Sequence, residues 1–316
     1  MSTYRFFANA PRNMEPLLAE ELTALGVKGV AETRGGVYFE DALAAGYRAC
    51  LWSRIANRVL LQLAHFPAET PEELYAGVKA IDWSAHFDVT RTFAINAITA
   101  RSQIDHSQFA ALKAKDAIVD QFRERTGERP TVDTFRPDIT ISVYLYRDRA
   151  TVSLDLAGES LHRRGYREEG ASAPLKENLA AAILLRAGWP GIAQAGGTLI
   201  DPMCGSGTLP IEAALMAADI APGLYRQHWG FRAWKQHAAS VWAALVDEAQ
   251  QRRDAGIPAL PPIRGYDRNP EAIAAARNNL ERAGLADHIT FERGDLAGCA
   301  PQPGDRPGLF VVNPPY

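Results

Sequence analysis

The stretch Asp201-Pro202-Met203-Cys204-Gly205-Ser206-Gly207-Thr208 decides the fold of the second half of the chain. It follows a short apolar run, Thr198-Leu199-Ile200, and precedes an apolar helical pattern from Leu209 to Ala218. Glycines between a strand and a helix let the backbone approach a ligand, and the helix then points its unpaired N–H groups at that ligand. The stretch therefore predicts an α/β sheet with a nucleotide-like ligand at one strand end.

The turn favours a zwitterionic ligand over a dinucleotide. A dinucleotide fingerprint requires a third glycine three residues after Gly207, where this chain has Pro210. Asp201 also disfavours a phosphate, because two negative charges would lie side by side. The α-amino and carboxylate groups of S-adenosylmethionine fit better, so we interpret residues 201–208 as part of a cofactor site.

Strands and helices alternate around this turn, which predicts a parallel sheet. A helix over 175–185 precedes the turn and is expected to end at Gly188-Trp189-Pro190. After the turn we expect strands over 263–266, 289–292 and 309–312, and a helix over 271–283.

Two further strand ends carry acidic residues. Asp267, followed by Arg268, ends the second strand, where a carboxylate can accept hydrogen bonds from both hydroxyls of a ribose. Asp295 ends the third strand and can accept from an adenine amine, while Leu296 covers the ring. A solvated turn carboxylate is the alternative for each. Amino-acid, ribose and adenine contacts on successive strand ends follow the order typical of a class I methyltransferase.

A second motif, Asn313-Pro314-Pro315-Tyr316, follows the apolar strand 309–312. Consecutive prolines fix the backbone and remove N–H donors, so the Asn313 side-chain oxygen and the Pro314 carbonyl can both accept from an amine. Two such acceptors help to turn the lone pair of a conjugated amine toward a methyl donor. Tyr316 can stack on a planar base that has left its helix. A proline-rich turn without catalysis is the alternative.

The composition is that of an ordinary globular protein, with 316 residues of which 47% are apolar and 22% charged. No apolar run approaches the ~20 residues of a membrane helix, and the N-terminus lacks a signal-peptide pattern, which predicts a cytoplasmic protein without a membrane partner. Cys50, Cys204 and Cys299 are widely separated and indicate neither disulfides nor a metal site. The net charge of −3 excludes a uniformly basic coat but allows a local basic face.

The first half alternates strands and helices in an α+β pattern. Its opening resembles half of a ferredoxin-like unit, and a second block continues to Leu156. The second block has a tight turn expected at Arg147-Asp148-Arg149, and its other expected elements are strands over 58–64, 92–99, 139–146 and 151–156 and a helix over 108–122. The proposed domains are a ferredoxin-like segment (1–57), an overlapping second domain (43–156), a linker (157–173) and the sheet domain (174–316).

An insertion runs from Pro222 to Pro262, with a helix expected over 233–253. It carries four large aromatic residues: Trp229, Phe231, Trp234 and Trp242. We favour packing of these aromatics onto the sheet, with stacking on a substrate as the alternative.

With these residues in view, the chain resembles the S-adenosylmethionine-dependent RNA methyltransferases that carry an N-terminal THUMP domain, and among them the bacterial 23S rRNA guanine-N2 methyltransferases. Besides the two motifs, the resemblance rests on five segments: Leu51-Trp52-Ser53-Arg54, Lys115-Asp116-Ala117-Ile118-Val119-Asp120, Leu161-His162-Arg163-Arg164-Gly165-Tyr166-Arg167, Ala173-Pro174-Leu175-Lys176-Glu177 and Ala221-Pro222-Gly223-Leu224. It runs the whole length of the chain.

The resemblance implies ferredoxin-like and THUMP domains, the latter over 43–156, followed by a Rossmann-like class I methyltransferase domain. It also implies that Pro174, Leu175 and Lys176 lie near the methionine part of the cofactor. Related enzymes continue past the Asn-Pro-Pro-Tyr loop, and the long form adds a second methyltransferase half. We therefore expect this chain to be C-terminally incomplete, with that half as a possible partner.

The resemblance further implies that the N-terminal domains hold large-subunit ribosomal RNA. The candidate phosphate-contacting residues are basic: Arg91, Arg101, Lys113, Lys115, Arg123, Arg125, Arg129 and Arg136. A solvated helix surface is the alternative. Methylation of another conjugated amine, such as adenine N6, and an RNA-binding module without turnover are the alternative functions.

Overall fold

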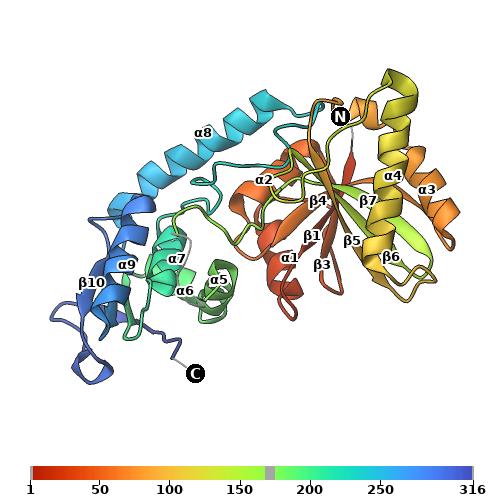
Figure 1. Cartoon of the computed structure of the whole chain (residues 1–316). Coiled ribbons are helices and arrows are strands. Elements are labelled where there is room, and N and C mark those ends of the chain that lie inside the picture. The colour runs from red at the N-terminus through yellow and green to blue at the C-terminus, as the bar shows by residue number, and fades with distance from the viewer. Residues whose placement is uncertain (1–2, 168–174, 315–316) are drawn as a thin grey trace.

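The computed structural model describes residues 3–167 and 175–314. In this part of the chain, strands form a seven-stranded sheet in the order β2-β3-β1-β4-β7-β6-β5 and a four-stranded sheet in the order β10-β9-β8-β11. The two sheets lie at opposite ends of the molecule, and α8 (Ala239–Gly256) runs along one side between them (Figure 1). The expectation of an α+β half followed by an α/β half is confirmed.

The seven-stranded sheet combines strands from both predicted N-terminal segments. Its strands are β1 (Tyr4–Asn9), β2 (Ala31–Thr33), β3 (Gly36–Asp41), β4 (Arg58–Pro67), β5 (Phe93–Ala100), β6 (Ile139–Tyr146) and β7 (Arg149–Asp155). The helices of this half are α1 (Glu15–Ala24), α2 (Leu43–Trp52), α3 (Pro71–Lys79), η1 (Trp83–Ala85) and α4 (Ser107–Thr126). Because β4 pairs with both β1 and β7, the two segments share one sheet and one hydrophobic core.

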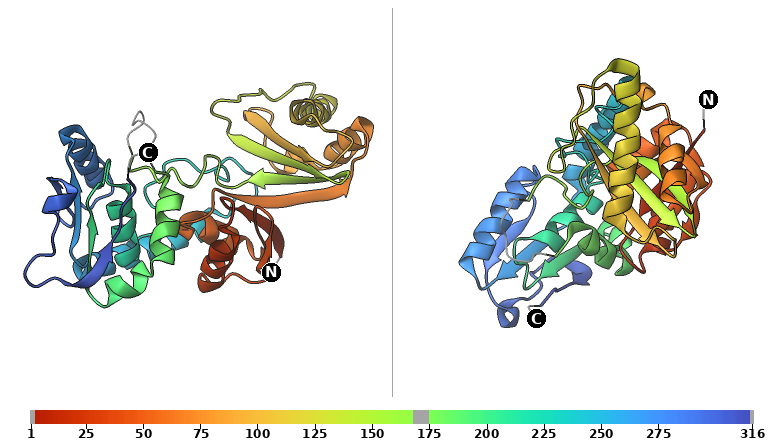
Figure 2. Two further views of the ribbon diagram at one scale, coloured as in Figure 1. Left: turned by 90° about the horizontal axis from the view of Figure 1, so that it is seen from below. Right: turned by 45° about the vertical axis from the view of Figure 1, so that its right-hand side comes forward.

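Side chains alternate between the two faces of this sheet. One face is buried under the helices and carries Phe6, Val37, Leu61, Leu154 and Ile141, which are at most 1% exposed. In the left view of Figure 2, α4 is seen end-on over one face of the strands β6 and β7. The register of the strands places the alternate residues on the other face.

The turn between β6 and β7 is shorter than the sequence predicts. Arg147 and Asp148 alone connect the strands, and both have positive φ, at 50° and 57°. Two residues in this conformation match the right-handed twist of a hairpin, which is why Arg149 is already part of β7.

The four-stranded sheet is parallel throughout. Its strands are β8 (Gly197–Asp201), β9 (Ile263–Asp267), β10 (Thr290–Arg293) and β11 (Arg306–Phe310). The helices of this half, besides α8, are α5 (Glu177–Arg186), α6 (Trp189–Gln194), α7 (Thr208–Ala217), η2 (Ile257–Ala259), α9 (Pro270–Arg282) and η3 (Leu296–Gly298). An ion pair between Arg264 of β9 and Asp305, with N–O distances of 2.6 and 2.9 Å, spans β8 and ties β11 into the sheet.

Two helix predictions in this half are wrong in their bounds. The Gly188-Trp189-Pro190 segment follows the end of α5, as expected, but Trp189 also begins a second helix, α6. Pro190 lies in the first turn of α6, where its missing N–H costs nothing. The insertion helix was expected over 233–253, but α8 begins only at Ala239 and Trp234 lies in the preceding turn.

The aromatic residues of the insertion pack, but mainly against the N-terminal half. Phe231 lies 4.6 Å from Tyr47 of α2 between ring centroids, and the indole N–H of Trp234 donates to His86 at 2.9 Å. Trp229 and Trp242 join the same core and are 6% and 8% exposed. The favoured interpretation, packing rather than substrate stacking, is confirmed, but the partner is not the parallel sheet.

Among the described helices, none is both long and apolar enough to cross a membrane.

Candidate cofactor and substrate site

The predicted ligand residues gather at one edge of the parallel sheet. Parallel strands place their carboxyl ends together, and the register pairs Asp201 with Gly265 and Asp267 with Arg293. In the strand order β10-β9-β8-β11, the edge carries Asp295, then Asp267, then Asp201, and the loop of Asn313 lies beyond β11. The chain order reverses at β8, and such switch points are where open α/β sheets bind ligands.

Asp201 is a buried carboxylate at the centre of this edge, with only 1% of the residue exposed. Its Oδ1 accepts a hydrogen bond from the N–H of Met203 at 3.1 Å. Burial raises the pKa of Asp201 to about 7, although that hydrogen bond lowers it, and the nearby charge of Asp267 raises it further. A cationic ligand group placed here would relieve both unfavourable effects.

Asp267 holds the glycine-rich turn against the next strand. One of its oxygens accepts from the N–H of Gly205 at 3.0 Å, and the other accepts from the N–H of Asn269 at 2.9 Å. The N–H of Cys204 also donates to the carbonyl of Tyr266 at 2.8 Å. The turn after β8 is therefore fixed to the end of β9.

The two glycines of the turn have different roles. Gly207 has a φ of +83°, and an added Cβ would lie 2.7 Å from the ring of Phe291. Gly205 has a φ of +54°, but an added Cβ would meet no atom within 4 Å. Gly207 thus lets α7 pack closely on β10, whereas Gly205 leaves open space beside the two carboxylates.

The remaining residues of the first motif are buried or half-buried and hold the turn in place. Cys204 is 7% exposed in the core, where burial raises the pKa of its thiol. Thr208 is 5% exposed and begins α7. Met203 and Ser206 are half-buried, and the carbonyl of Ser206 accepts from the side chain of Asn279 at 3.0 Å.

The adenine end of the predicted site is open. Asp295 is exposed and caps η3 by accepting from the N–H of Gly298 at 3.1 Å. Leu296 follows it with 55% of its surface exposed. Arg268 is also exposed, and its carbonyl accepts from Arg293 at 3.2 Å.

The substrate loop is described only in part. Asn313 is half-buried and Pro314 exposed, just beyond the point where the N–H of Val311 donates to Ile200 at 3.0 Å. The predicted residues Pro174, Pro315 and Tyr316 lie outside the described residues. Leu175 is half-buried, and Lys176 is exposed at the start of α5.

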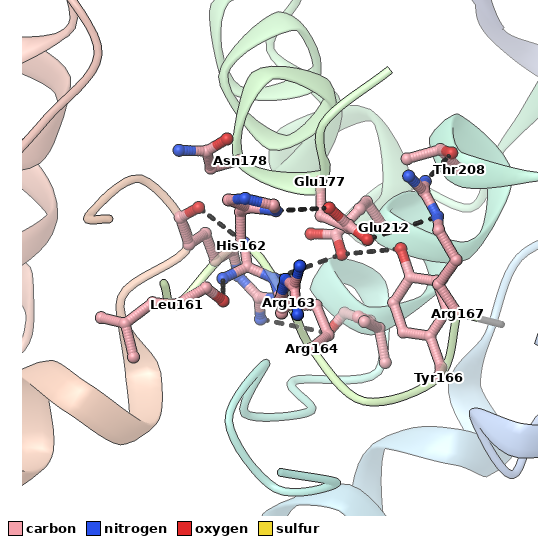
Figure 3. A network of polar contacts seen from close by, with 12 residues as sticks. Leu161, His162, Arg163, Arg164, Tyr166, Arg167, Glu177, Asn178, Thr208 and Glu212 are labelled. Carbon is pink, nitrogen blue, oxygen red and sulfur yellow. Dashed lines mark hydrogen bonds and ion pairs between the residues drawn. The ribbon is translucent and has the colours of Figure 1, made fainter. Parts of the chain in front are cut away.

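Arg167 is a further residue at this edge, and none of the sequence motifs assigns it to the cofactor site. It donates to the hydroxyl of Thr208 and, at 3.1 Å, to the carbonyl of Leu175 (Figure 3). Glu177 lies 3.4 Å from Arg167 and 3.2 Å from the ring of His162. Arg167 therefore joins the start of α7 to the segment leading into α5, and its place in a supposed linker concealed it.

The same segment carries a buried ionic cluster that joins the two halves. Arg164 is 1% exposed, lies 3.5 Å from Glu212 of α7, and donates to the carbonyl of Arg54 at 2.6 Å. The hydroxyl of Tyr166 donates to Glu212 at 3.1 Å, and Arg54 donates to the carbonyl of Ile220 at 2.9 Å. Glu21 of α1 completes the cluster by accepting from the N–H of Arg54 at 2.7 Å (Figure 3 shows its central part). Leu161, Arg164 and Tyr166 are thus packed between the halves rather than solvated.

No group of three or more His, Cys, Asp or Glu side chains in residues 3–167 and 175–314 is arranged to hold a metal ion.

Family models match three successive parts of the chain. Residues 5–60 match a ferredoxin-like domain of RlmL, residues 68–155 match a THUMP domain, and residues 164–316 match an RMKL-like methyltransferase domain.

Curated relatives match over almost the whole chain. A ribosomal RNA large subunit methyltransferase K/L from Syntrophotalea carbinolica is 57% identical over 99% of this chain and 44% of the relative. The same-named protein from Methylococcus capsulatus is 55% identical over 99% of this chain and 42% of the relative. The chain thus spans less than half the length of these relatives.

Solved structures share the architecture over the whole chain. A protein from Listeria monocytogenes, described as a predicted N6-adenine-specific DNA methylase, has a TM-score of 0.88 and 33% identity, covering 100% of this chain and 80% of its own. A putative methyltransferase complexed with SAH has a TM-score of 0.85 and 31% identity, covering 100% of this chain and 81% of its own.

Proposed function

The chain belongs to the RMKL-like methyltransferases that carry a THUMP domain, and from this we propose that it transfers a methyl group from S-adenosylmethionine to the exocyclic N2 of a guanine in 23S ribosomal RNA. The single observation that best supports binding of this cofactor is the row of three carboxylates on successive strand ends: Asp201, Asp267 and Asp295. The guanine N2 and the ribosomal RNA come from the family and from the names of the relatives.

The cofactor residues divide along the sheet edge. Asp201, once ionised, accepts from the cofactor's ammonium group, and the space beside Gly205 admits the amino-acid part. Asp267 accepts from the ribose hydroxyls, with Asp295 and Leu296 at the adenine. By the family resemblance, Pro174, Leu175 and Lys176 belong near the methionine part. S-adenosylmethionine supplies an electrophilic methyl group on a sulfonium.

The substrate loop supplies acceptors for the amine. The side-chain oxygen of Asn313 and the carbonyl of Pro314 accept from the two N–H groups of the guanine amine, which orients its lone pair. Pro315 fixes the loop, and Tyr316 stacks on the base after it has been flipped out. No acid or base with an unusual pKa is needed for this step.

A second candidate keeps the chemistry and changes the acceptor. The name of the Listeria relative specifies adenine N6, and the same two loop acceptors would serve that amine. The THUMP match favours RNA over DNA as the carrier of the base.

The test is to incubate the chain with undermodified 23S ribosomal RNA and labelled S-adenosylmethionine, and then to identify the labelled nucleoside. We expect label in N2-methylguanosine, and none with Asn313→Ala. Label in N6-methyladenosine would establish the second candidate. Absence of label despite cofactor binding would identify an RNA-binding module without turnover.

A further inference from the structure

The basic residues that the sequence suggested for RNA contact are mostly engaged with acidic neighbours. Lys115 lies 2.6 Å from Asp116 and Arg123 lies 3.6 Å from Asp120, all on α4. The other ion pairs of this set join Lys113 to Glu72, Arg125 to Asp82 and Arg91 to Asp138. A surface on which most cations have a nearby carboxylate offers little net attraction for phosphates.

A different surface combines exposed and half-buried aromatic rings with arginines. It is the sheet face opposite the helices, here called the open face, and it carries Tyr38, Tyr144, Tyr146, Arg5 and Arg149, with Arg34 in the adjoining β2–β3 turn. Tyr144 is 38% exposed, and its register partner Ile98 on β5 is 60% exposed. Rings of this size at the surface of a sheet remain available for stacking.

Two of the rings on this face are parallel, and cations contact one of them, Tyr146. Tyr144 and Tyr146 are nearly parallel, with 7° between their planes and 6.1 Å between centroids. Arg147 lies over the Tyr146 ring at 5.2 Å, and Arg101 lies 3.5 Å from its hydroxyl. Fixed, parallel rings bind a stacked base with little further loss of side-chain entropy.

Polar contacts join the two central strands of the open face, β4 and β7. His65 lies 3.0 Å from the hydroxyl of Thr151, and Arg149 donates to its other ring nitrogen at 2.9 Å. Burial lowers the pKa of His65, and so do the charges of Arg149 and Arg5. Burial also raises the pKa of Tyr144, with a contribution from Tyr38, four positions away in the sheet order.

The charge on the open face is mainly positive. Arg5 is paired with Glu40 at 3.0 Å, and both side chains are more than half exposed. Arg34 and Arg149 are exposed. Arg149 donates to a ring nitrogen of His65, Nε2, and this contact is not an ion pair. Cations interleaved with rings are the pattern that binds phosphates and bases together.

We propose that the open face of the seven-stranded sheet binds a single-stranded segment of RNA, with bases stacked on Tyr38, Tyr144 and Tyr146 and phosphates contacted by Arg34 and Arg149. This inference rests on the proposed function for its choice of RNA. It adds which surface binds the RNA and that the bound RNA is single-stranded. Single-stranded RNA fits because its bases are free to stack, whereas an A-form duplex hides its base faces.

The experiment measures binding of the whole chain to a fluorescein-labelled, non-self-complementary RNA of about 12 nucleotides by anisotropy. A duplex of the same sequence is the competitor. The test variants are Tyr144→Ala/Tyr146→Ala and Arg34→Gln/Arg149→Gln. The matched controls are Tyr144→Phe/Tyr146→Phe, which keeps the rings, and Lys113→Gln/Arg123→Gln on α4. Thermal unfolding checks that each variant is folded.

We expect the alanine pair to weaken single-strand binding about tenfold or more, since each stacked base contributes about 5- to 150-fold. The phenylalanine pair and the α4 pair should stay within about threefold. The arginine pair should lower the salt dependence of log affinity by roughly 1 to 2. Equal loss in the α4 pair, or tighter binding of the duplex, would overturn the proposal, as would wild-type affinity in both open-face variants.

Cofactor calorimetry on the same proteins separates this inference from the proposed function. An alanine pair that binds S-adenosylmethionine normally but loses the oligonucleotide supports the open face. A wild-type chain that binds the oligonucleotide through this face but not the cofactor contradicts the proposed function alone.

Discussion

The two sheets of this molecule present their functional residues in different ways. In the four-stranded parallel sheet, the candidate site lies at an edge, where each strand end contributes one residue in order. In the seven-stranded sheet, the aromatic and basic residues lie across an open face and come from several strands. A parallel sheet is covered on its faces, so its edge is the accessible part, whereas a mixed sheet with helices on one face leaves the other available.

This difference decides which function the sequence reveals. Edge residues follow their strands directly, so one short motif contains all the residues that contact one part of the ligand. The motif from Asp201 to Thr208 is an example. Face residues are separated by more than a hundred positions along the chain, as Tyr38 and Tyr144 are, and no local motif contains them.

The strongest test of how the two sheets act together is Arg164→Met. It removes the cation beside Glu212 and leaves the carbonyls of Leu161 and Arg54 without their donor in the core. We expect the free energy of unfolding to fall by about 3 to 5 kcal/mol, measured by urea denaturation. Arg123→Met, which breaks an exposed ion pair on α4, should cost less than about 1 kcal/mol. Equal losses of unfolding free energy in the two variants would mean that the buried ionic cluster does not join the halves.

At the sheet edge, Asp267→Ala should weaken binding of S-adenosylmethionine about 10- to 100-fold. The variant loses the anchor of the Gly205 N–H and, in the proposed function, the acceptors for the ribose. Asp295→Ala is the matched comparison, because that carboxylate is exposed and should matter less than about tenfold. Calorimetry at one pH measures both, and a larger effect at Asp295 would contradict the assigned order.

Arg167→Met tests whether the junction also positions the cofactor turn. The variant loses the contacts with Thr208 and the carbonyl of Leu175, so cofactor affinity should fall about 3- to 10-fold. Arg167→Lys should recover part of the loss. If the melting temperature falls and cofactor affinity does not change, Arg167 is structural only.

The smallest effect is expected on α4. Lys115→Gln removes a cation that already lies 2.6 Å from Asp116, so RNA affinity should change by less than about twofold. Anisotropy titrations at two salt concentrations measure this. A large, salt-dependent loss would move the RNA surface from the open face to the helix.

The sequence predicted the parallel half well because its signals are local. The strand before Asp201, the glycine turn and the helix after Thr208 all lie within about twenty residues and appear as expected. Arg167 and Glu212 were not selected, because their roles depend on the packing of a segment between two domains. The merging of both N-terminal segments into one sheet depends on β4 pairing on both sides, which no local pattern encodes.

The central claim is that the buried carboxylate of Asp201 binds the ammonium group of S-adenosylmethionine, and the most direct measurement is the pH dependence of cofactor affinity. The pKa of Asp201 is raised to about 7 in the ligand-free protein, mainly by burial. Because the pKa is raised in the folded protein, the free energy of unfolding falls as the pH rises from about 4 to about 7. In this range the carboxylate is ionised in the unfolded chain but still protonated in the folded one.

Below pH 7, the cofactor must displace the proton from Asp201. We therefore predict that calorimetric affinity falls by close to tenfold per pH unit from about pH 7 to about pH 5, and that Asp201→Asn binds weakly with a flat profile. A wild-type affinity that is constant between pH 5 and pH 8, or an Asp201→Asn variant that binds as tightly as wild type, would contradict the account.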